Sequence, residues 1–425
     1  MRIAKIEVDP EMVSAKPSDG LHWRTRFDFA LSENGKAGLY SSKTKKVVEI
    51  DECSIAVKDI NNSEIFSGDE ICLSGKNKDV EVGSELLGRV IDGLGQPLDD
   101  KGPIKSTGNM NINGEYINPF DRGEISSVLN VGIKSINALT TIGCGQRIGI
   151  IAGSGVGKSV LLSMITQNSE AEVIVVGLIG ERGRELATFT REITASHSNN
   201  KVVIVAVPAD QSPLLRIQGA KRATSIAEYF RDEGKNVLLI LDSLTRVAHA
   251  QRELGLAVGE QPTSRGYPPS VISLIPALIE RTGVGIKSKG SITSIYTILA
   301  DGDDTVSDPI VDNARAILDG HIILSRKLAQ QGIYPAIDVG NSISRIMIDL
   351  ISSEQAENAQ KLRKLISIYQ ENQDLLLMGG YVQGQDADLD QAVQKWPDIV
   401  KFLHQDKHAK ISFADANKMM SELVA

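Results

Sequence analysis

The sequence is poor in cysteine and in aromatic residues, and it has no apolar run long enough to cross a membrane. Its three cysteines, Cys53, Cys72 and Cys144, include no CxxC pair, and an odd number does not favour a disulfide framework. Aromatic residues make up 4%, which leaves little material for base-stacking platforms. The longest apolar runs fall far short of the about 20 residues that span a bilayer, and the N-terminus lacks the apolar core of a signal peptide. We therefore expect a soluble cytoplasmic protein that reaches a membrane only through partners.

An excess of positive charge is also absent. Lys and Arg total 46 against 54 Asp and Glu, which gives a net charge of −8 and argues against binding nucleic acid through bulk charge. Hydrophobic residues make up 41% and charged residues 24%, which is typical of a globular chain. The 425 residues predict about two or three domains.

The local patterns predict three parts. Residues 1–82 contain short stretches of strand character, at 3–8, 25–30, 46–50 and 70–74, which indicate a small β-barrel or sandwich. Residues 83–352 form the second part. They begin with a Gly-, Asp- and Pro-rich connecting segment over 83–114 and continue with solid apolar runs that alternate with helices, which predicts a parallel sheet covered by helices. Residues 353–425 predict a helical domain, with helices over 354–377 and 388–404 and from 413 onward.

The strongest motif is a phosphate-binding loop that follows the predicted strand 147–151 and opens a helix. Its glycines let backbone amides curl around phosphates, and the helix N-terminus adds a positive dipole. Lys158 is expected to reach the β- and γ-phosphates of ATP, and the Ser159 hydroxyl to ligate Mg²⁺. The nucleotide-binding residues predicted here are Gly153, Ser154, Gly155, Val156, Gly157, Lys158, Ser159 and Val160.

Two carboxylates follow other apolar runs of the predicted sheet. Asp242 ends the run 237–241, where it is placed to help hold Mg²⁺, although an apolar run that ends in Asp can also be purely structural. Glu181 follows the run 173–179, and a carboxylate at that edge can polarise an attacking water. A surface turn with weak Glu–Arg ion pairs is an equally good interpretation of Glu181 from spacing alone.

Several longer motifs carry a family resemblance. AGSGVGKS, GERGRE, LLILDSLTR, GYPPSV, ILDGHIILSR and YPAIDVGNSISR, in this order, resemble the catalytic-subunit family of rotary ATP synthases, and within it the flagellar and type III secretion export ATPases. The resemblance runs from about residue 83 to the C-terminus and is weaker before it. It implies an α/β fold: a RecA-like parallel-sheet P-loop ATPase core with an N-terminal β-barrel and a C-terminal helical domain.

The resemblance also implies roles for single residues. Glu181 matches the general base, Arg182 its neighbour on the γ-phosphate side, and Arg246 an arginine near the phosphates. Tyr334 matches the aromatic residue that packs on adenine, and Arg345 an arginine finger supplied across a subunit interface, whereas the residues alone favour a solvated arginine at 345. With base, loop and finger in one chain, we expect a homo-oligomeric ring, as in the family a hexamer.

The predicted function is hydrolysis of Mg-ATP to energise protein export through a flagellar or type III secretion apparatus, with a slight preference for the flagellum. The implied partners are a stator-like negative regulator, a central stalk protein, an export gate, secretion chaperones and exported proteins. Assembly would hold the ring at the cytoplasmic face of the inner membrane through these partners, and no nucleic acid is expected.

Two alternatives stay open. One is the catalytic subunit of a rotary ATP synthase or ion pump, which copurification with proton-pump partners would reveal. The other is a ring-shaped RNA translocase, which RNA-stimulated ATPase activity would reveal. The sequence leaves open the choice between flagellum and virulence system, the cargo, the oligomeric state in isolation and the roles of loops 266–269 and 301–304.

Overall fold

The structure is a computed structural model of the 425-residue chain. It describes residues 79–425 except 196–198, 287–288 and 301–307, and the backbone of four strands within residues 1–78. The chain divides into two compact units, Met1–Asp79 and Val80–Ala425, so the division lies three residues before the predicted boundary after residue 82. Loop 301–304, Cys53 and Cys72 lie outside the described residues, and Cys144 is a partly buried free thiol.

The described strands of the first unit form one antiparallel sheet in the order β1-β2-β3-β4. Their bounds are β1 Ala4–Glu7, β2 Arg26–Leu31, β3 Ala37–Tyr40 and β4 Val47–Glu49. Three of the predicted strands are therefore present, β3 was not predicted, and the predicted strand at 70–74 lies outside the described residues. Closure of the sheet into a barrel stays a prediction.

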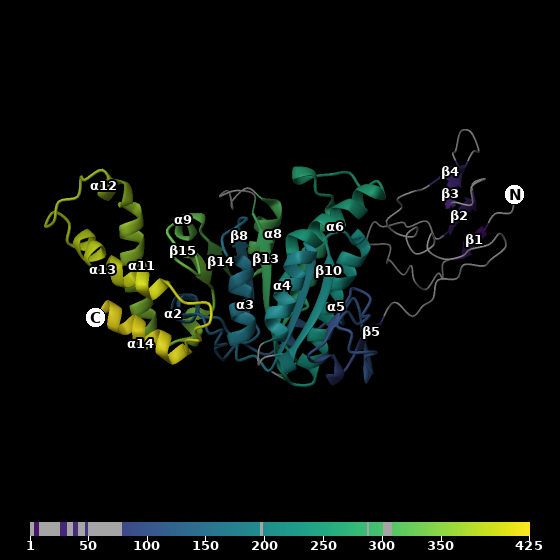
Figure 1. Cartoon of the computed structure of the whole chain (residues 1–425), viewed down its shortest axis with the longest axis horizontal. Helices are drawn as coiled ribbons and strands as arrows, with labels where there is room; N and C mark the ends of the chain where they lie inside the picture. The colour runs from purple at the N-terminus through teal and green to yellow at the C-terminus, as the bar shows by residue number, and fades with distance from the viewer. Residues whose placement is uncertain are drawn as a thin grey trace. The chain divides into compact units, whose positions relative to one another are not determined.

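A mostly parallel sheet is the centre of the second unit (Figure 1), as the apolar runs predict. Among the described residues it has nine strands, eight of them in the order β15-β14-β8-β13-β11-β9-β10-β6, with β12 paired to β13. Only β12 and β15 run antiparallel to their neighbours within this described sheet. The bounds are β6 Val90–Ile91, β8 Arg147–Ala152, β9 Val173–Glu181, β10 Val202–Pro208, β11 Asn236–Asp242, β12 Gly283–Val284, β13 Ser291–Leu299, β14 Gly320–Leu324 and β15 Ile337–Ser344.

Helices cover both faces of this sheet, because successive strand residues point to opposite sides. Ile150 packs with α2, α3 and α4 on one face, and the next residue, Ile151, packs with α5, α6, α7 and α8 on the other. The helix bounds are α2 Lys134–Leu139, α3 Lys158–Asn168, α4 Gly183–Thr194, α5 Pro213–Asp232, α6 Leu244–Ala257, α7 Pro269–Glu280, α8 Pro309–Ile317, α9 Arg326–Gln330 and α10 Met347–Leu350.

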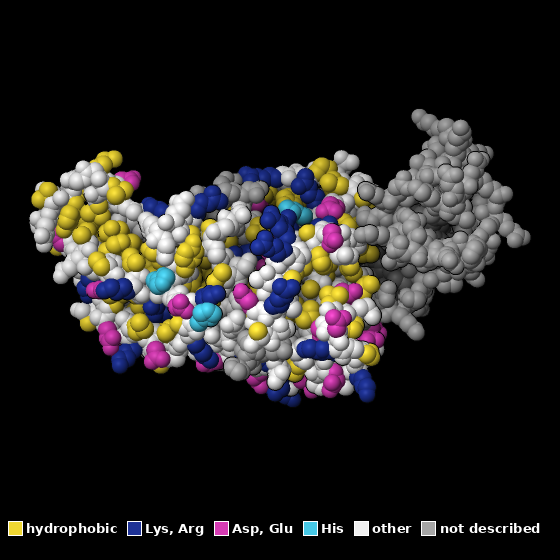
Figure 2. All heavy atoms as spheres, in the orientation of Figure 1, with side chains coloured by type: hydrophobic (Ala, Val, Ile, Leu, Met, Phe, Trp, Pro, Cys, Tyr) yellow, Lys and Arg dark blue, Asp and Glu magenta, His cyan; other side chains and the backbone are white. Residues whose placement is uncertain are grey.

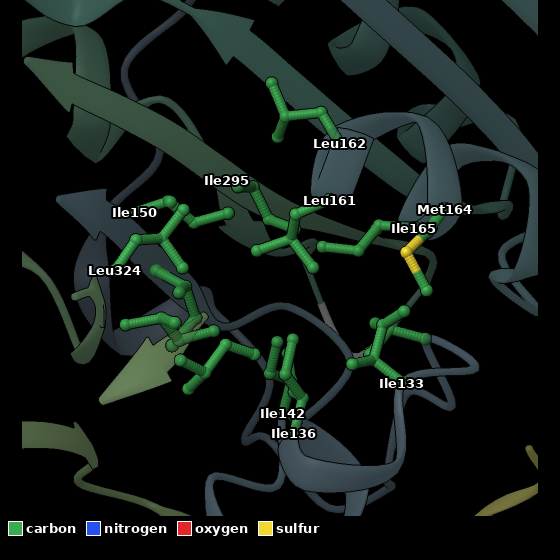
Figure 3. Packing of buried hydrophobic residues seen from close by; sticks show 14 of the residues in the cluster. Ile133, Ile136, Ile142, Ile150, Leu161, Leu162, Met164, Ile165, Ile295 and Leu324 are labelled. Atoms are coloured by element: carbon green, nitrogen blue, oxygen red, sulfur yellow. The ribbon is translucent and has the colours of Figure 1, made fainter. Parts of the chain in front are cut away.

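The close-up in Figure 3 shows how the first of these cores fixes the helix that follows β8. Leu161 and Ile165 of α3 point toward Ile150 of β8 and Ile136 of α2, and all four are at most 1% exposed. Burying an aliphatic side chain of this size stabilises the fold by roughly 1.5–3 kcal/mol. The start of α3 is thereby held rigidly at the end of β8.

The Gly-rich segment over 83–114 is not a free connection, and that prediction is wrong. Its residues Val90 and Ile91 form β6, which pairs in parallel with β10 at the end of the main sheet. Residues Gly108–Asn111 form β7, which pairs with β5 (Asp79–Val82). Leu86, Ile91 and Ile112 of this segment are buried in one cluster with residues of α5, so the segment gains enough apolar contact to fold onto the core despite its turn residues.

The chain ends in a helical region, as predicted, whose bounds are α11 Ser353–Glu371, α12 Gln373–Leu377, α13 Ala387–Leu403 and α14 Phe413–Val424. The single helix predicted over 354–377 is interrupted at Asn372, which caps α11 and donates its side-chain amide to the Ile368 carbonyl. Buried residues of α11, α13 and α14 join the core around α2 and α3. None of the described helices is both long enough and apolar enough to cross a membrane.

Candidate active site

The phosphate loop connects β8 to α3. Gly155 and Gly157 have φ values of 79° and 91°, a left-handed conformation that side chains other than glycine rarely adopt. A Cβ at Gly155 would meet no atom within 4 Å, so this side of the loop is open to a ligand. The backbone N–H groups at the start of the eleven-residue helix α3 face the same loop, which gives the donors and the dipole that a phosphate group requires.

Lys158, Glu181 and Asp242 meet beside this loop, as predicted from three separate stretches of sequence. They come from the start of α3, the end of β9 and the end of β11. The Lys158 Nζ forms an ion pair with Asp242 Oδ1 and lies 3.7 Å from Glu181 Oε1. All three side chains are about nine-tenths buried, with exposures of 11%, 10% and 7%, so their charges interact with little screening by solvent.

Glu181 has the features of a general base. Its Oε1 is buried and has no hydrogen-bond partner among the described residues, which leaves it free to accept a proton from water. Burial raises the pKa of Glu181 above its ordinary value of 4.5, while the positive charge of Lys158 opposes that shift. A carboxylate with a raised pKa holds a transferred proton better than an exposed one does.

Asp242 has a second partner that the sequence did not predict. Thr297, on the neighbouring strand β13, donates its hydroxyl to Asp242 Oδ1 at 2.6 Å. The Ser159 side chain is exposed at the second residue of α3. A carboxylate and a hydroxyl offer the oxygen ligands that Mg²⁺ prefers, and Mg²⁺ takes its remaining ligands from phosphates and water. The residues present therefore fit Mg-nucleotide.

Tyr334 lies beside the phosphate loop. A Cβ at Gly157 would come 3.4 Å from the Cδ1 and Cε1 atoms of the Tyr334 ring. The side chain is 42% exposed, which leaves part of it available to a ligand. The strand register explains its place, since Ile337 lies opposite Leu324, which pairs with Ala152 at the beginning of the loop. We call the edge of the sheet that carries Ala152, Glu181 and Asp242 the carboxyl edge.

The two further arginines predicted here differ from each other. Arg246, on α6, packs against Gly180, because a Cβ on that glycine would come 2.8 Å from the Cβ of Arg246. Its positive charge is among those that oppose the rise in the pKa of Glu181. Arg182 has a side chain that is 84% exposed and lies 3.9 Å from Glu185. The structure does not bring Arg182 into contact with Lys158.

Arg345 lies at the opposite edge of the sheet, which we call the amino edge. Ser344 is opposite Gly320, which pairs with Ile148, and the step along β8 from residue 148 to residue 152 spans roughly 13 Å at about 3.3 Å per residue. The exposed Arg345 donates its backbone N–H to the Asp319 carbonyl at 2.9 Å and its Nη2 to the Arg315 carbonyl at 3.1 Å. Arg345 is therefore far from the phosphate loop of its own chain.

The family to which the chain belongs follows from comparison with known proteins. The model of the ATP synthase alpha/beta family, nucleotide-binding domain, matches residues 132–344, and that of the C-terminal domain of the type III secretion ATPase EscN matches residues 351–422. The chain belongs to the ATP synthase alpha/beta family.

Similar proteins indicate to which branch of the ATP synthase alpha/beta family this family member belongs. The flagellum-specific ATP synthase of Pseudomonas aeruginosa is 50% identical over 344 residues, which is 81% of this chain and 76% of that protein. The flagellum-specific ATP synthase of Salmonella typhimurium is 51% identical over 339 residues, 80% of this chain and 74% of that protein. This family member is thus an ATPase of flagellar or type III export.

Solved structures of the same branch agree with the fold. The assembled ATPase EscN of the enteropathogenic E. coli type III secretion system is 38% identical, with a TM-score of 0.80 over 93% of this chain and 94% of that one. A prototypical ATPase from the type III secretion system of pathogenic bacteria is 43% identical, with a TM-score of 0.76 over 82% of this chain and 100% of that one. The RecA-like core of this ATP synthase alpha/beta family member is therefore confirmed.

Proposed function

We propose that this ATPase hydrolyses Mg-ATP at the carboxyl edge, with Glu181 as the general base. The observation that carries the proposal is the buried Glu181 carboxylate. Its Oε1 lies 3.7 Å from Lys158 Nζ and has no hydrogen-bond partner in the part of the chain that the structure describes. A water placed beside Oε1 gives its proton to the carboxylate as its oxygen attacks the γ-phosphorus. The bond from that phosphorus to the bridging oxygen of ADP then breaks, so the products are ADP and phosphate.

The other residues of the carboxyl edge bind and orient the nucleotide. Lys158 places its charge on the β- and γ-phosphates, Ser159 and Asp242 hold Mg²⁺, and Tyr334 packs on adenine. Mg²⁺, when bound, neutralises charge that develops between the β- and γ-phosphates. Arg246 supplies further positive charge beside Glu181. The residues proposed to line the phosphates are Gly153, Ser154, Gly155, Val156, Gly157, Lys158, Ser159, Val160 and, with the least structural support, Arg182.

We further propose that the enzyme works as a homohexameric ring in which Arg345 serves the site of a neighbouring subunit. Arg345 is exposed at the amino edge between two exposed apolar residues, Ile343 at 48% and Ile348 at 76%. Val160, 50% exposed, lies beside the phosphate loop at the other edge. Exposed apolar residues at two different places on one chain favour a head-to-tail interface, which closes into a ring. A fixed cation there would meet the charge that develops on the γ-phosphate.

Mixing two inactive variants tests the shared site. Lys158→Ala removes the phosphate contact of a subunit and Arg345→Ala removes the finger that it offers. In rings assembled from both, a site on an Arg345→Ala subunit next to a Lys158→Ala subunit is complete, so equal amounts should recover up to about a quarter of wild-type turnover if subunits mix randomly. Mixed rings with no more activity than either variant alone would contradict a finger that acts between subunits.

The helical region is proposed to contact a central stalk. The structure of EscN has been solved in complex with its central stalk EscO, which motivates an equivalent partner here. In the view of Figure 2, hydrophobic side chains cover much of the surface over the helical region. Leu377 and Met378, at the end of α12, are 79% and 84% exposed, as expected of a surface that another protein covers. A stator-like regulator, an export gate, secretion chaperones and exported proteins complete the proposed partners, and through them the ring would sit at the cytoplasmic face of the inner membrane.

We propose the flagellum as the apparatus, because the flagellum-specific relatives are 50% and 51% identical to this chain, more than the type III secretion ATPases of known structure. The test replaces the chromosomal gene with a Glu181→Gln allele and counts flagellar filaments by electron microscopy. Loss of filaments in Glu181→Gln cells but not in Glu185→Gln cells is the expected result. Normal filaments together with loss of a virulence secretion system would instead favour the injectisome.

A further inference from the structure

Arg363, on α11, reaches from the helical region into the main sheet. Its Nη1 donates to the carbonyls of Val339 and Ser342, the latter at 3.2 Å, and its Nη2 donates to the carbonyl of Leu139 at the end of α2. One guanidinium thus joins three elements: the first helix of the helical region, the strand β15, and α2. Because an arginine side chain is planar and carries five donors in a fixed fork, it holds these carbonyls in one arrangement.

The charge of Arg363 has no carboxylate to balance it among the described residues. Burial lowers the pKa of Arg363, and no acidic group among the described residues opposes that shift. A partly buried cation of this kind is tolerated only while hydrogen bonds compensate for lost hydration. Displacement of β15 would therefore be opposed by the cost of leaving the guanidinium without acceptors.

The strand that Arg363 holds is the one that leads to Arg345. β15 is the last strand at one side of the described sheet, so it has a neighbouring strand, β14, on one side only. Near its end, the Ser344 hydroxyl donates to the Thr141 carbonyl at 2.8 Å. Arg363 adds the link from the helical region, three residues before Arg345 at Ser342. These hydrogen bonds fix β15 to α11 and to the end of α2.

We propose that Arg363 is a positioning residue for the arginine finger, which it aims at the site of the neighbouring subunit by fixing β15 to α11 and α2. This inference rests on the proposed role of Arg345 between subunits. A finger displaced by about 1 Å loses much of its effect, since a misplacement of that size can cost about 100-fold in rate. Arg363→Gln is therefore expected to lower kcat by about 10- to 100-fold, with little change in the affinity of its own subunit for nucleotide.

The test asks which variants complement Arg363→Gln in mixed rings. If Arg363 positions the finger, Arg363→Gln supplies an intact nucleotide site but a poor finger, so it should recover activity when mixed with Lys158→Ala and not when mixed with Arg345→Ala. The opposite pattern, with recovery only beside Arg345→Ala, would place the defect in the subunit's own site and overturn the proposal. Recovery with neither, or undiminished activity of Arg363→Gln alone, would also overturn it.

Two controls keep the result interpretable. The pair Lys158→Ala with Arg345→Ala must recover activity first, because failure of that pair contradicts the shared site itself rather than the role of Arg363. Lys361→Ala, an exposed position on the same helix, should leave kcat unchanged. If Arg363→Gln does not fold, Arg363→Lys tests the same point, since one ammonium cannot reproduce the planar fork, and its complementation pattern is then decisive.

Discussion

The two edges of the main sheet differ in how their charged side chains are buried and paired. At the carboxyl edge, Lys158, Glu181 and Asp242 are about nine-tenths buried, and the one cation pairs with both carboxylates. At the amino edge, Arg345 is exposed, and its partners among the described residues are backbone carbonyls. Opposite charges can be buried together because each one compensates the other, whereas Arg345, whose described partners are backbone carbonyls, stays in contact with solvent. The carboxyl edge thus gathers charges of both signs within one chain, and the amino edge presents the cation that we propose serves a neighbouring subunit.

In Figure 2, Lys and Arg side chains gather over the upper middle of the main body, the side at which β8 and β13 end in Figure 1. We expect such a gathering of cations to favour an anionic ligand there despite the net charge of −8 over the whole chain. The overall charge argues against bulk nucleic-acid binding, but it gave no sign of this local concentration of cations.

The largest expected effect comes from removing the cation of the carboxyl edge. Lys158→Ala should abolish nucleotide binding and hydrolysis, because the phosphates lose their principal positive partner. It should also lower Tm, since breaking a buried ion pair from one side costs about 3–5 kcal/mol. Binding of a fluorescent ATP analogue and thermal unfolding measure the two effects. Lys364→Ala, which removes an exposed lysine that pairs with Asp388, is the matched control and should change neither. Retained nucleotide binding in Lys158→Ala would contradict the site.

The next effect comes from the amino edge. Arg345→Ala should lower kcat by about 10³- to 10⁵-fold, the range of arginine fingers in related chemistry, while nucleotide affinity and Tm stay near the wild-type values. The two edges would then be separable, one needed for binding and the other for turnover. Single-turnover hydrolysis and nucleotide affinity decide this, with the exposed Arg191→Ala as control. A parallel loss of affinity would mean that Arg345 acts on binding.

Glu181 gives a third, smaller effect within the carboxyl edge. Glu181→Gln should keep nucleotide binding and lower kcat by about 10²- to 10⁴-fold, the usual contribution of a general base. The base works only when deprotonated, and burial raises its pKa, so the wild-type rate should fall with decreasing pH at values above the ordinary 4.5. The pH profile of kcat checks the sign, and the limb should vanish in Glu181→Gln but not in Glu185→Gln. An acidic limb retained in Glu181→Gln would assign it to another group.

The sequence predicted the carboxyl edge well, for a physical reason. Each of its residues follows a buried apolar strand or a Gly-rich turn, and the ends of parallel strands meet at one edge of a sheet. Strand β15 was not predicted as a strand, because its burial alternates with exposed polar residues and its position at the side of the sheet leaves it without a continuous apolar run. The segment over 83–114 was misjudged because turn residues hide a two-residue strand that only its pairing with β10 reveals.

Contacts between residues that are far apart along the chain could not be predicted from the sequence. Arg363 reaches Leu139 across 224 positions of sequence, and no local pattern reports such a pairing. Thr297 stands inside the apolar run of β13, where a β-branched residue is ordinary strand material, so its hydroxyl gave no sign of a partner. The one signal available was a polar residue, Thr297, near the carboxyl end of a buried strand. It predicts a contact only when the neighbouring strand is known to be β11, which ends in Asp242.

Substitution of Thr297 should give the smallest of these effects. It separates metal binding at the carboxyl edge from the reaction at the phosphate. Its hydroxyl donates to Asp242 Oδ1 at 2.6 Å, the same oxygen that contacts Lys158. A hydrogen bond to a charged group contributes about 1.5–3 kcal/mol, so Thr297→Val should raise the Mg²⁺ concentration for half-maximal activity about tenfold while kcat at saturating Mg²⁺ changes little. Thr297→Ser keeps the hydroxyl and should behave like wild type. Equal behaviour of the Val and Ser variants would mean that Lys158 alone orients Asp242, and a loss of kcat without a shift in Mg²⁺ dependence would move the role of Thr297 from the metal to the reacting phosphate.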